Sequence, residues 1–225
     1  MTTNNDLIFA QSTAAMLDIA ERQGNADRTI RLQQATKVCQ AAVDDFDKFS
    51  TIYRTTYLPA AAAAETNALR QRISAQVFQA TDGLLRDLLA DEQGYRVRLA
   101  SAPTLNSDTT LLTVEARQHL LKLDALIRQE TLLEAARCGD SVTVEAMRSC
   151  PRWFRDADGV AMATPELSAK VLELFGARTS PNIAALLAQV VDTRIALQTL
   201  IRDTRRHCEI VDDKDVIVTT MGKAV

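Results

Sequence analysis

Apolar side chains recur at helical spacing along most of the chain. In the first half they alternate in steps of three and four residues, at Leu32, Ala35, Cys39, Ala42, Phe46, Phe49 and Tyr53. A second run keeps a similar rhythm, at Leu69, Ile73, Val77, Ala80, Leu84 and Leu88. Such steps place side chains on one face of an α-helix. Because Pro59 lies between the runs and disfavours helical geometry in the residue before it, they predict a long antiparallel hairpin over residues 27–93.

Cap signals predict where the helices around this hairpin begin and end. A first helix should end at Gln23, because Gly24 after it tolerates the left-handed conformation of a helix C-cap. Asp27 can cap the helix that follows. Gly94 is expected to stop the second hairpin helix. Residues 95–108 then form a linker, whose alternating apolar positions suggest a short extended piece.

The region 108–208 contains the signals of four or five shorter helices. In chain order, its breaks and caps are Asp124, Gly139, Asp140 or Ser141, Pro151, Thr164-Pro165 and Ser180-Pro181. Ser, Thr and Asp cap helix N-termini, and proline suits the first helical position. Gly176 is expected to close the helix that Thr164 starts, and the last helix should reach about Cys208. The β-branched tail 216-VIVTT-220 could be a strand or a loose end.

Composition supports a wholly helical fold. Among 225 residues there are only 7 Gly and 5 Pro, and apolar residues make up 47%. We expect an all-α protein with two regions, residues 1–100 with the hairpin and 101–225 with a compact C-terminal helical bundle. The net charge of -3 does not favour nucleic acid as partner. No apolar run approaches the roughly 20 residues that span a bilayer, and no basic segment resembles a secretory signal. A cytoplasmic protein without membrane contact is expected.

In that compartment the four cysteines should be free thiols. Cys138 and Cys150 lie twelve residues apart in the segment 138-CGDSVTVEAMRSCPRWF-154, and the chain has no CxxC pair. A zinc site built from these two with Cys208 and His207 would require the last helix to fold back on this segment. Buried thiols that pack as small hydrophobes are the favoured interpretation.

The two histidines each follow a carboxylate by four residues, in the pairs Glu115/His119 and Asp203/His207. Di-iron helical bundles use a three-residue step, so ordinary intrahelical charge pairs are expected. No G-x-S-x-G elbow and no glycine-rich phosphate loop can be written for the chain. We therefore expect no catalytic residue, no cofactor and no metal ligand.

Arginines and aromatic residues mark candidate contact surfaces instead. Arginines cluster at Arg148, Arg152 and Arg155 and again at Arg202, Arg205 and Arg206. Trp153-Phe154 is the most concentrated aromatic pair, and such pairs either plug a core or anchor an interface. The possible interaction surface comprises Leu32, Cys39, Phe46, Phe49, Tyr53, Arg148, Arg152, Trp153 and Phe154.

The segment 132-LLEAARCGDSVTVEAMRSCPRWF-154 resembles one ankyrin unit, but no second unit follows, so an ankyrin array is rejected. It is also similar to a group of helical proteins encoded among tailed-phage and prophage genes. In that group a long helical hairpin precedes a segment of the form LLKLD…LLEAA..GD…VEAM…P.W, followed by terminal helices. The similarity covers roughly residues 110–205, with Gly139-Asp140 and Pro151 as its sharpest points. It implies a phage or prophage setting and no particular activity.

Together these features favour a non-enzymatic helical protein that works in assembly or protein interaction. A homo-oligomer is expected, because a long hairpin exposes apolar stripes that other helices or another copy must cover. The location would be the host cytoplasm or, for a phage protein, the virion. Two alternatives stay open: a nucleic-acid-associated regulator that uses the arginine clusters, and a helical metal-binding enzyme that uses His119 or His207.

Overall fold

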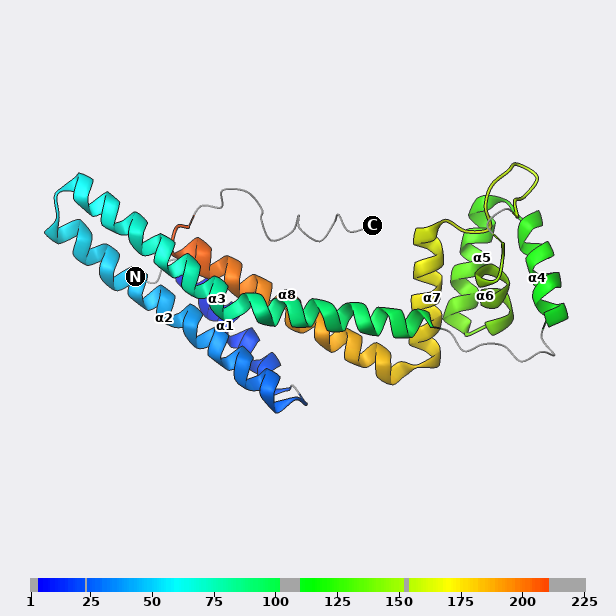
Figure 1. Ribbon diagram of the computed structural model, residues 1–225, viewed down its shortest axis with the longest axis horizontal. Helices are drawn as coiled ribbons and strands as arrows, with labels where there is room; N and C mark the ends of the chain where they lie inside the picture. The colour runs from blue at the N-terminus through cyan, green and yellow to red at the C-terminus, as the bar shows by residue number, and fades with distance from the viewer. Residues whose placement is uncertain (1–3, 23, 102–109, 152–153, 211–225) are drawn as a thin grey trace. The chain divides into compact units, whose positions relative to one another are not determined.

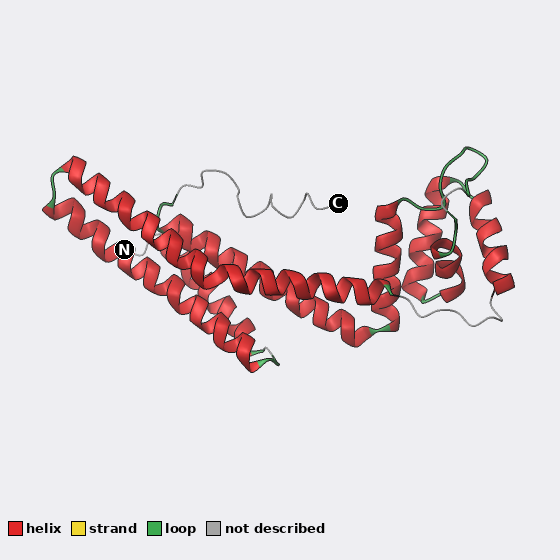
Figure 2. Ribbon diagram, viewed as in Figure 1, coloured by secondary structure: helices red, strands yellow, loops and turns green. Residues whose placement is uncertain are grey.

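The predicted all-α class is confirmed by the computed structural model, which describes residues 4–22, 24–101, 110–151 and 154–210. Those residues form helices joined by turns and by a longer loop between Arg148 and Pro165, and their only β-type pairing is an isolated bridge between Arg155 and Ala161 (Figure 2). The tail 216–220 lies outside the described residues. The helices are α1 (Asn4–Glu21), α2 (Ala26–Thr56), α3 (Pro59–Ala100), α4 (Thr110–Lys122), α5 (Ala125–Cys138), α6 (Ser141–Arg148), α7 (Pro165–Thr179) and α8 (Pro181–His207).

The chain folds into two compact units. The first, here called the hairpin unit, comprises residues 1–89 and 191–225, and the second, the short-helix unit, comprises residues 90–190. Two long helices, α3 and α8, each pass from one unit into the other (Figure 1). The sequence predicted two regions, 1–100 and 101–225, and the chain itself changes unit twice because the second half of α8 belongs to the first unit.

The hairpin unit is built on α2 and α3, which run side by side in opposite directions (Figure 1). The first seam faces the interior of this unit, since Leu32, Ala35, Cys39, Ala42 and Phe46 are all buried. The facing positions on α3 are buried as well, at Leu69, Ile73, Val77, Leu84 and Leu88. The cap of α2 differs from the prediction. The side chain of Asn25, rather than Asp27, accepts the backbone N–H of Arg28 at 3.2 Å.

Helix α1 and the second half of α8 cover the apolar stripe of the hairpin. Met16 and Ala20 of α1 are fully buried, and the Thr29 hydroxyl on α2 donates to the carbonyl of Ala20 at 3.2 Å. On the α8 side Leu197 and Leu200 are fully buried. The sequence predicted that either other helices of the chain or a second copy would cover this stripe. Helices of the same chain cover it.

Two predicted helix ends are wrong. Gly94 does not stop α3, which continues to Ala100 through the piece predicted to be extended, and Gly176 lies inside α7. Leu99 near the end of α3 is 2% exposed, and a Cβ on Gly176 would overlap its backbone carbonyl. Glycine at position 176 thus permits close contact between α7 and the end of α3.

The short-helix unit follows its cap signals closely. The chain breaks between α4 and α5 at residues 123–124, as predicted, and Gly139 ends α5 in the left-handed conformation at φ 78°. The Asp140 side chain accepts the N–H groups of Val142 and Thr143 and so caps α6. Thr164 caps α7 in the same way. These caps turn α4 to α7 around one core of Leu120, Leu132, Ala135, Ala136, Val144, Ala146, Met147, Met162, Val171 and Phe175.

One helix among the described residues, α8, is long and apolar enough to cross a membrane by length and composition alone. The sequence has no continuous apolar run here, because Asp192 and Arg194 interrupt the helix. The mean hydropathy over an 18-residue window of the helix is nevertheless high enough for a membrane span. A core helix of a soluble protein passes the same test, so the finding is weak evidence for a membrane. Only 28% of that window is buried, and Leu186 and Ile195 stay exposed.

Candidate functional site

The structure separates the residues predicted to form an interaction surface. Leu32, Cys39 and Phe46 lie in the interior of the hairpin unit, where a partner could not reach them. Phe49 and Tyr53, further along the same helix, are half-buried and lead to the end of the hairpin.

The remaining members belong to the short-helix unit. Arg148 forms an ion pair with Glu145 at 2.7 Å, and Phe154 is 38% exposed. Arg152 and Trp153 lie outside the described residues. The second arginine cluster, Arg202, Arg205 and Arg206, is at the end of α8 and belongs to the hairpin unit.

The end of the α2–α3 hairpin carries an aromatic ladder. The rings of Phe49 and Tyr53 are stacked with centroids 6.2 Å apart, and Tyr53 meets Tyr57 edge-on at 5.7 Å. Ile52, Tyr57 and Leu58 are 40%, 47% and 81% exposed. We call these five residues the hairpin tip. In Figure 2 the loop at this end lies beyond α1 and beyond the part of α8 in the same unit, so neither helix covers it.

The short-helix unit exposes large apolar side chains of its own. Leu111 of α4 is 69% exposed and Leu126 of α5 is 77% exposed, with Leu112 and Ile127 beside them in sequence. Unlike the hairpin tip, they have no aromatic ring contacts among those found in the described residues. These side chains can therefore serve as a control surface in experiments on the tip.

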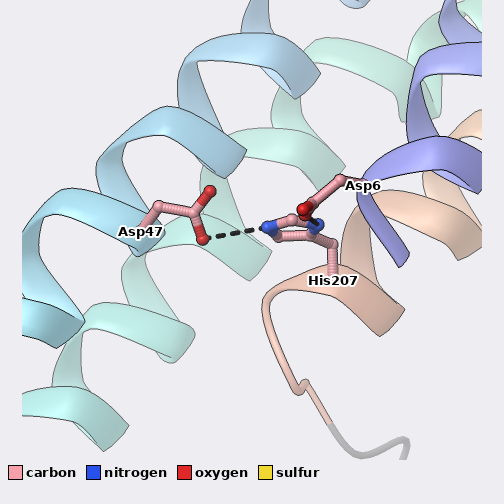
Figure 3. A group of neighbouring side chains, drawn as sticks. All are labelled: Asp6, Asp47 and His207. Atoms are coloured by element: carbon pink, nitrogen blue, oxygen red, sulfur yellow. Dashed lines mark hydrogen bonds and ion pairs between the residues drawn. The ribbon is translucent and has the colours of Figure 1, made fainter. Parts of the chain in front are cut away.

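A second candidate site lies where three helices of the hairpin unit meet. Asp6 comes from the first turn of α1, Asp47 from the middle of α2, and His207 from the last position of α8 (Figure 3). The imidazole lies between the two carboxylates. Its Nε2 is 2.9 Å from Asp47 Oδ1, and its Nδ1 is 3.5 Å from Asp6 Oδ1. One ligand atom from each of the three residues lies within 4.8 Å of the other two.

Sequence reasoning missed this cluster because it paired each histidine with a carboxylate on its own helix. His207 instead contacts Asp47 and Asp6, and the nearby Asp203 is contacted by Arg202 Nε at 3.5 Å. The second expected pair is also not formed, since Glu115 and His119 are both exposed and no ion pair joins them. Residues 6 and 47 are too distant in sequence from residue 207 for a local pattern to indicate their contact.

All four cysteines are free thiols, as predicted. Cys39 and Cys208 are buried in the hairpin unit, where Cys208 Sγ donates to the carbonyl of Ala42 at 3.8 Å. Burial, with smaller contributions from Asp47 and Cys39, raises the pKa of Cys208 to about 12. A thiol with so high a pKa is a packing group rather than a nucleophile. Cys138 and Cys150 belong to the short-helix unit, and the prediction that such thiols are buried is wrong for Cys138. Cys138 is exposed and donates to Glu134 Oε1 at 3.3 Å, and Cys150 is half-buried.

The short-helix unit contains a buried ion pair. Arg128 of α5 is 2% exposed, and its Nη2 donates to Asp156 Oδ2 at 2.6 Å. Asp156 Oδ1 also accepts the backbone N–H groups of Asp158 and Val160, so one carboxylate organises the loop between α6 and α7. The Arg128 hydrogen bond, helped by these backbone donors, holds the pKa of Asp156 below its usual value. We assign this pair a structural role, because it fixes a loop to a helix.

Comparison with protein-family models, with curated proteins and with solved structures found no match for this chain.

Proposed function

We propose that this protein is a non-enzymatic helical assembly protein that self-associates through its hairpin tip. The observation that carries the proposal is the aromatic ladder of Phe49, Tyr53 and Tyr57, which ends in the exposed side chains of Tyr57, Ile52 and Leu58. Phage or prophage assembly is the setting that we propose, on the sequence resemblance described above, with the host cytoplasm or the virion as location.

The tip has the chemistry of an interface centre. Tyrosine gives large contact area at low conformational cost, and aromatic anchors dominate the binding energy of protein interfaces. Leu58 is 81% exposed in a turn, where a polar residue would serve the fold equally well. Burying such side chains against a partner gains roughly 25 cal/mol for each Å² of apolar surface removed from water.

A second copy of the chain is the occupant that we propose. A two-fold interface brings the same patch of both copies together, so the patch must complement itself. The tip meets this requirement through its apolar and aromatic side chains, since Arg54 beside them pairs with Glu209 of its own chain at 3.9 Å.

Light scattering on the purified full-length protein tests the proposal. The wild type should have the mass of a dimer or a larger oligomer. Leu58→Glu should weaken association at least tenfold, about 1.4 kcal/mol, because it buries a charge at the centre of the interface. Leu126→Glu is the matched control, since it places the same charge at a leucine of similar exposure in the short-helix unit.

Three results would overturn the proposal. A wild type that is monomeric at high concentration would exclude self-association altogether. A Leu58→Glu variant with unchanged mass would exclude the tip as the interface. Dissociation of the Leu126→Glu variant alone would place the interface on the short-helix unit. Circular dichroism of both variants verifies that the helices are retained.

A further inference from the structure

We propose that His207, Asp6 and Asp47 form a binding site for one divalent transition-metal ion, with Zn²⁺ as the representative cation. This site is independent of self-association through the hairpin tip. The ion would lie between Nδ1 of His207 and the carboxylate of Asp6, while Asp47 holds the imidazole from its other side (Figure 3).

The hydrogen-bonding state of His207 is the first argument. Its side chain is 7% exposed, and Nδ1 is buried without a hydrogen-bond partner among the described residues. If Nε2–H donates to Asp47 Oδ1 at 2.9 Å, a neutral imidazole presents the lone pair of Nδ1 toward Asp6. A lone pair and a carboxylate oxygen 3.5 Å apart repel each other. A cation between them converts this repulsion into two favourable contacts.

The separation of the two ligand atoms fits such an ion. Zn²⁺ binds histidine nitrogen and carboxylate oxygen at about 2.0 to 2.2 Å, so two ligands at the tetrahedral angle lie about 3.4 Å apart. Nδ1 of His207 and Oδ1 of Asp6 are 3.5 Å apart. The two groups therefore need almost no rearrangement to hold the ion, and imidazole with carboxylate is a ligand set that zinc uses.

Asp47 has the geometry of a supporting group. Metal-binding histidines commonly donate their second N–H to a carboxylate, which fixes the tautomer and raises the basicity of the coordinating nitrogen. The Asp47 carboxylate receives Nε2 in this way, on the opposite side of the ring from the proposed ion. Water would occupy the remaining positions.

A bound ion would join elements that are far apart in sequence. It would connect the first turn of α1 to the last residue of α8, with α2 beneath both. We infer that the ion fixes the ends of α1 and α8 on the hairpin, in addition to the ion pairs that Glu209 makes with Arg54 and Arg70.

A proton is the competing occupant. An imidazole with both nitrogens protonated would donate to Asp47 and Asp6 and would satisfy the same geometry without a metal. The two occupants differ in one observable, since only a metal site shows saturable, stoichiometric binding of Zn²⁺ to the metal-free protein.

Isothermal titration of metal-free, full-length protein with ZnCl₂ is the test. We expect one site, and the loss of at least a hundredfold in affinity for His207→Asn. Asp47→Asn should lose about 10- to 100-fold, the usual effect of removing a supporting carboxylate. His119→Asn and Asp44→Asn are the matched controls and should bind like the wild type, since one is the chain's other histidine and the other is an exposed aspartate one turn before Asp47.

A second readout separates this site from the thiols. With Co²⁺ as probe, the visible absorption of a nitrogen and oxygen site lacks the intense near-ultraviolet bands of a thiolate site. The proposal is overturned if the wild type binds no Zn²⁺ saturably, if His207→Asn binds as tightly as the wild type, or if thiolate bands accompany binding. The Asp47→Asn variant keeps the test valid if His207→Asn does not fold, because the Asp47 side chain is 59% exposed.

Discussion

The two units of the protein place their polar groups in opposite ways. In the hairpin unit long helices pack along apolar stripes, and charged contacts such as Arg31 with Asp87 lie at the surface. In the short-helix unit a charged pair, Arg128 with Asp156, lies inside, and the turns before α6 and α7 depend on Gly139 and on the caps Asp140 and Thr164. In a long helix many apolar positions repeat along one face, and together they specify the hairpin. Short helices have few repeats, so single residues must specify how they turn and pack.

Among the variants that test this contrast, replacing Arg128 is expected to cause the largest loss of stability. Because the guanidinium is 2% exposed, Arg128→Ala removes the charge that compensates a buried carboxylate. The free energy of unfolding should fall by about 3 to 5 kcal/mol, measured by urea denaturation with circular dichroism. Arg137→Ala is the matched control on the same helix and should have little effect, because its side chain is 60% exposed. Equal losses in both variants would show that the buried pair does not stabilise the unit.

Adding a methyl group at position 176 should cause an intermediate loss of stability. Gly176→Ala forces a Cβ against the backbone carbonyl of Leu99, so the end of α3 must move away from α7. We expect a loss of about 2 kcal/mol in the free energy of unfolding. Gly94→Ala is the control, and it should raise the free energy of unfolding. Its position in α3 is open, so it should gain about 0.5 to 1 kcal/mol from higher helix propensity. A stabilised Gly176→Ala variant would contradict the close approach of the two helices.

The smallest effect is expected in the hairpin unit. Arg31 Nη1 donates to Asp87 Oδ2 at 2.7 Å between α2 and α3, but both side chains are largely exposed. Arg31→Ala should therefore cost less than about 1 kcal/mol, and salt should reduce the difference from the wild type. Thermal unfolding at low and high ionic strength measures this difference in stability. A loss as large as that of Arg128→Ala would mean that polar contacts, rather than the apolar stripe, hold this hairpin together.

Sequence reasoning succeeded where a signal is local. The seam from Leu32 to Phe46 is buried as its spacing predicted, and Pro59 and Thr164 start helices as their chemistry requires. It failed at Gly94 and Gly176, because a helix can also continue through a glycine. Gly176 allows the backbone of Leu99 to approach, whereas Gly94 has open space around it.

For the candidate sites, the sequence identified Phe49 and Tyr53 by their spacing but could not separate them from the buried members of the same seam. It identified neither the cluster around His207 nor the partner of Arg128. The contacts of His207 join residues 160 or more positions apart, and no periodic pattern encodes such a contact.

By itself, the sequence determined the helical class, the hairpin and most helix starts, because periodicity, proline and capping residues act over a few positions. Tertiary structure alone decided which part of a seam is covered, how far α3 extends and which charges meet. Burial and electrostatic pairing depend on distance in space, and that distance is set only when α8 returns to the hairpin unit and α7 packs against the end of α3.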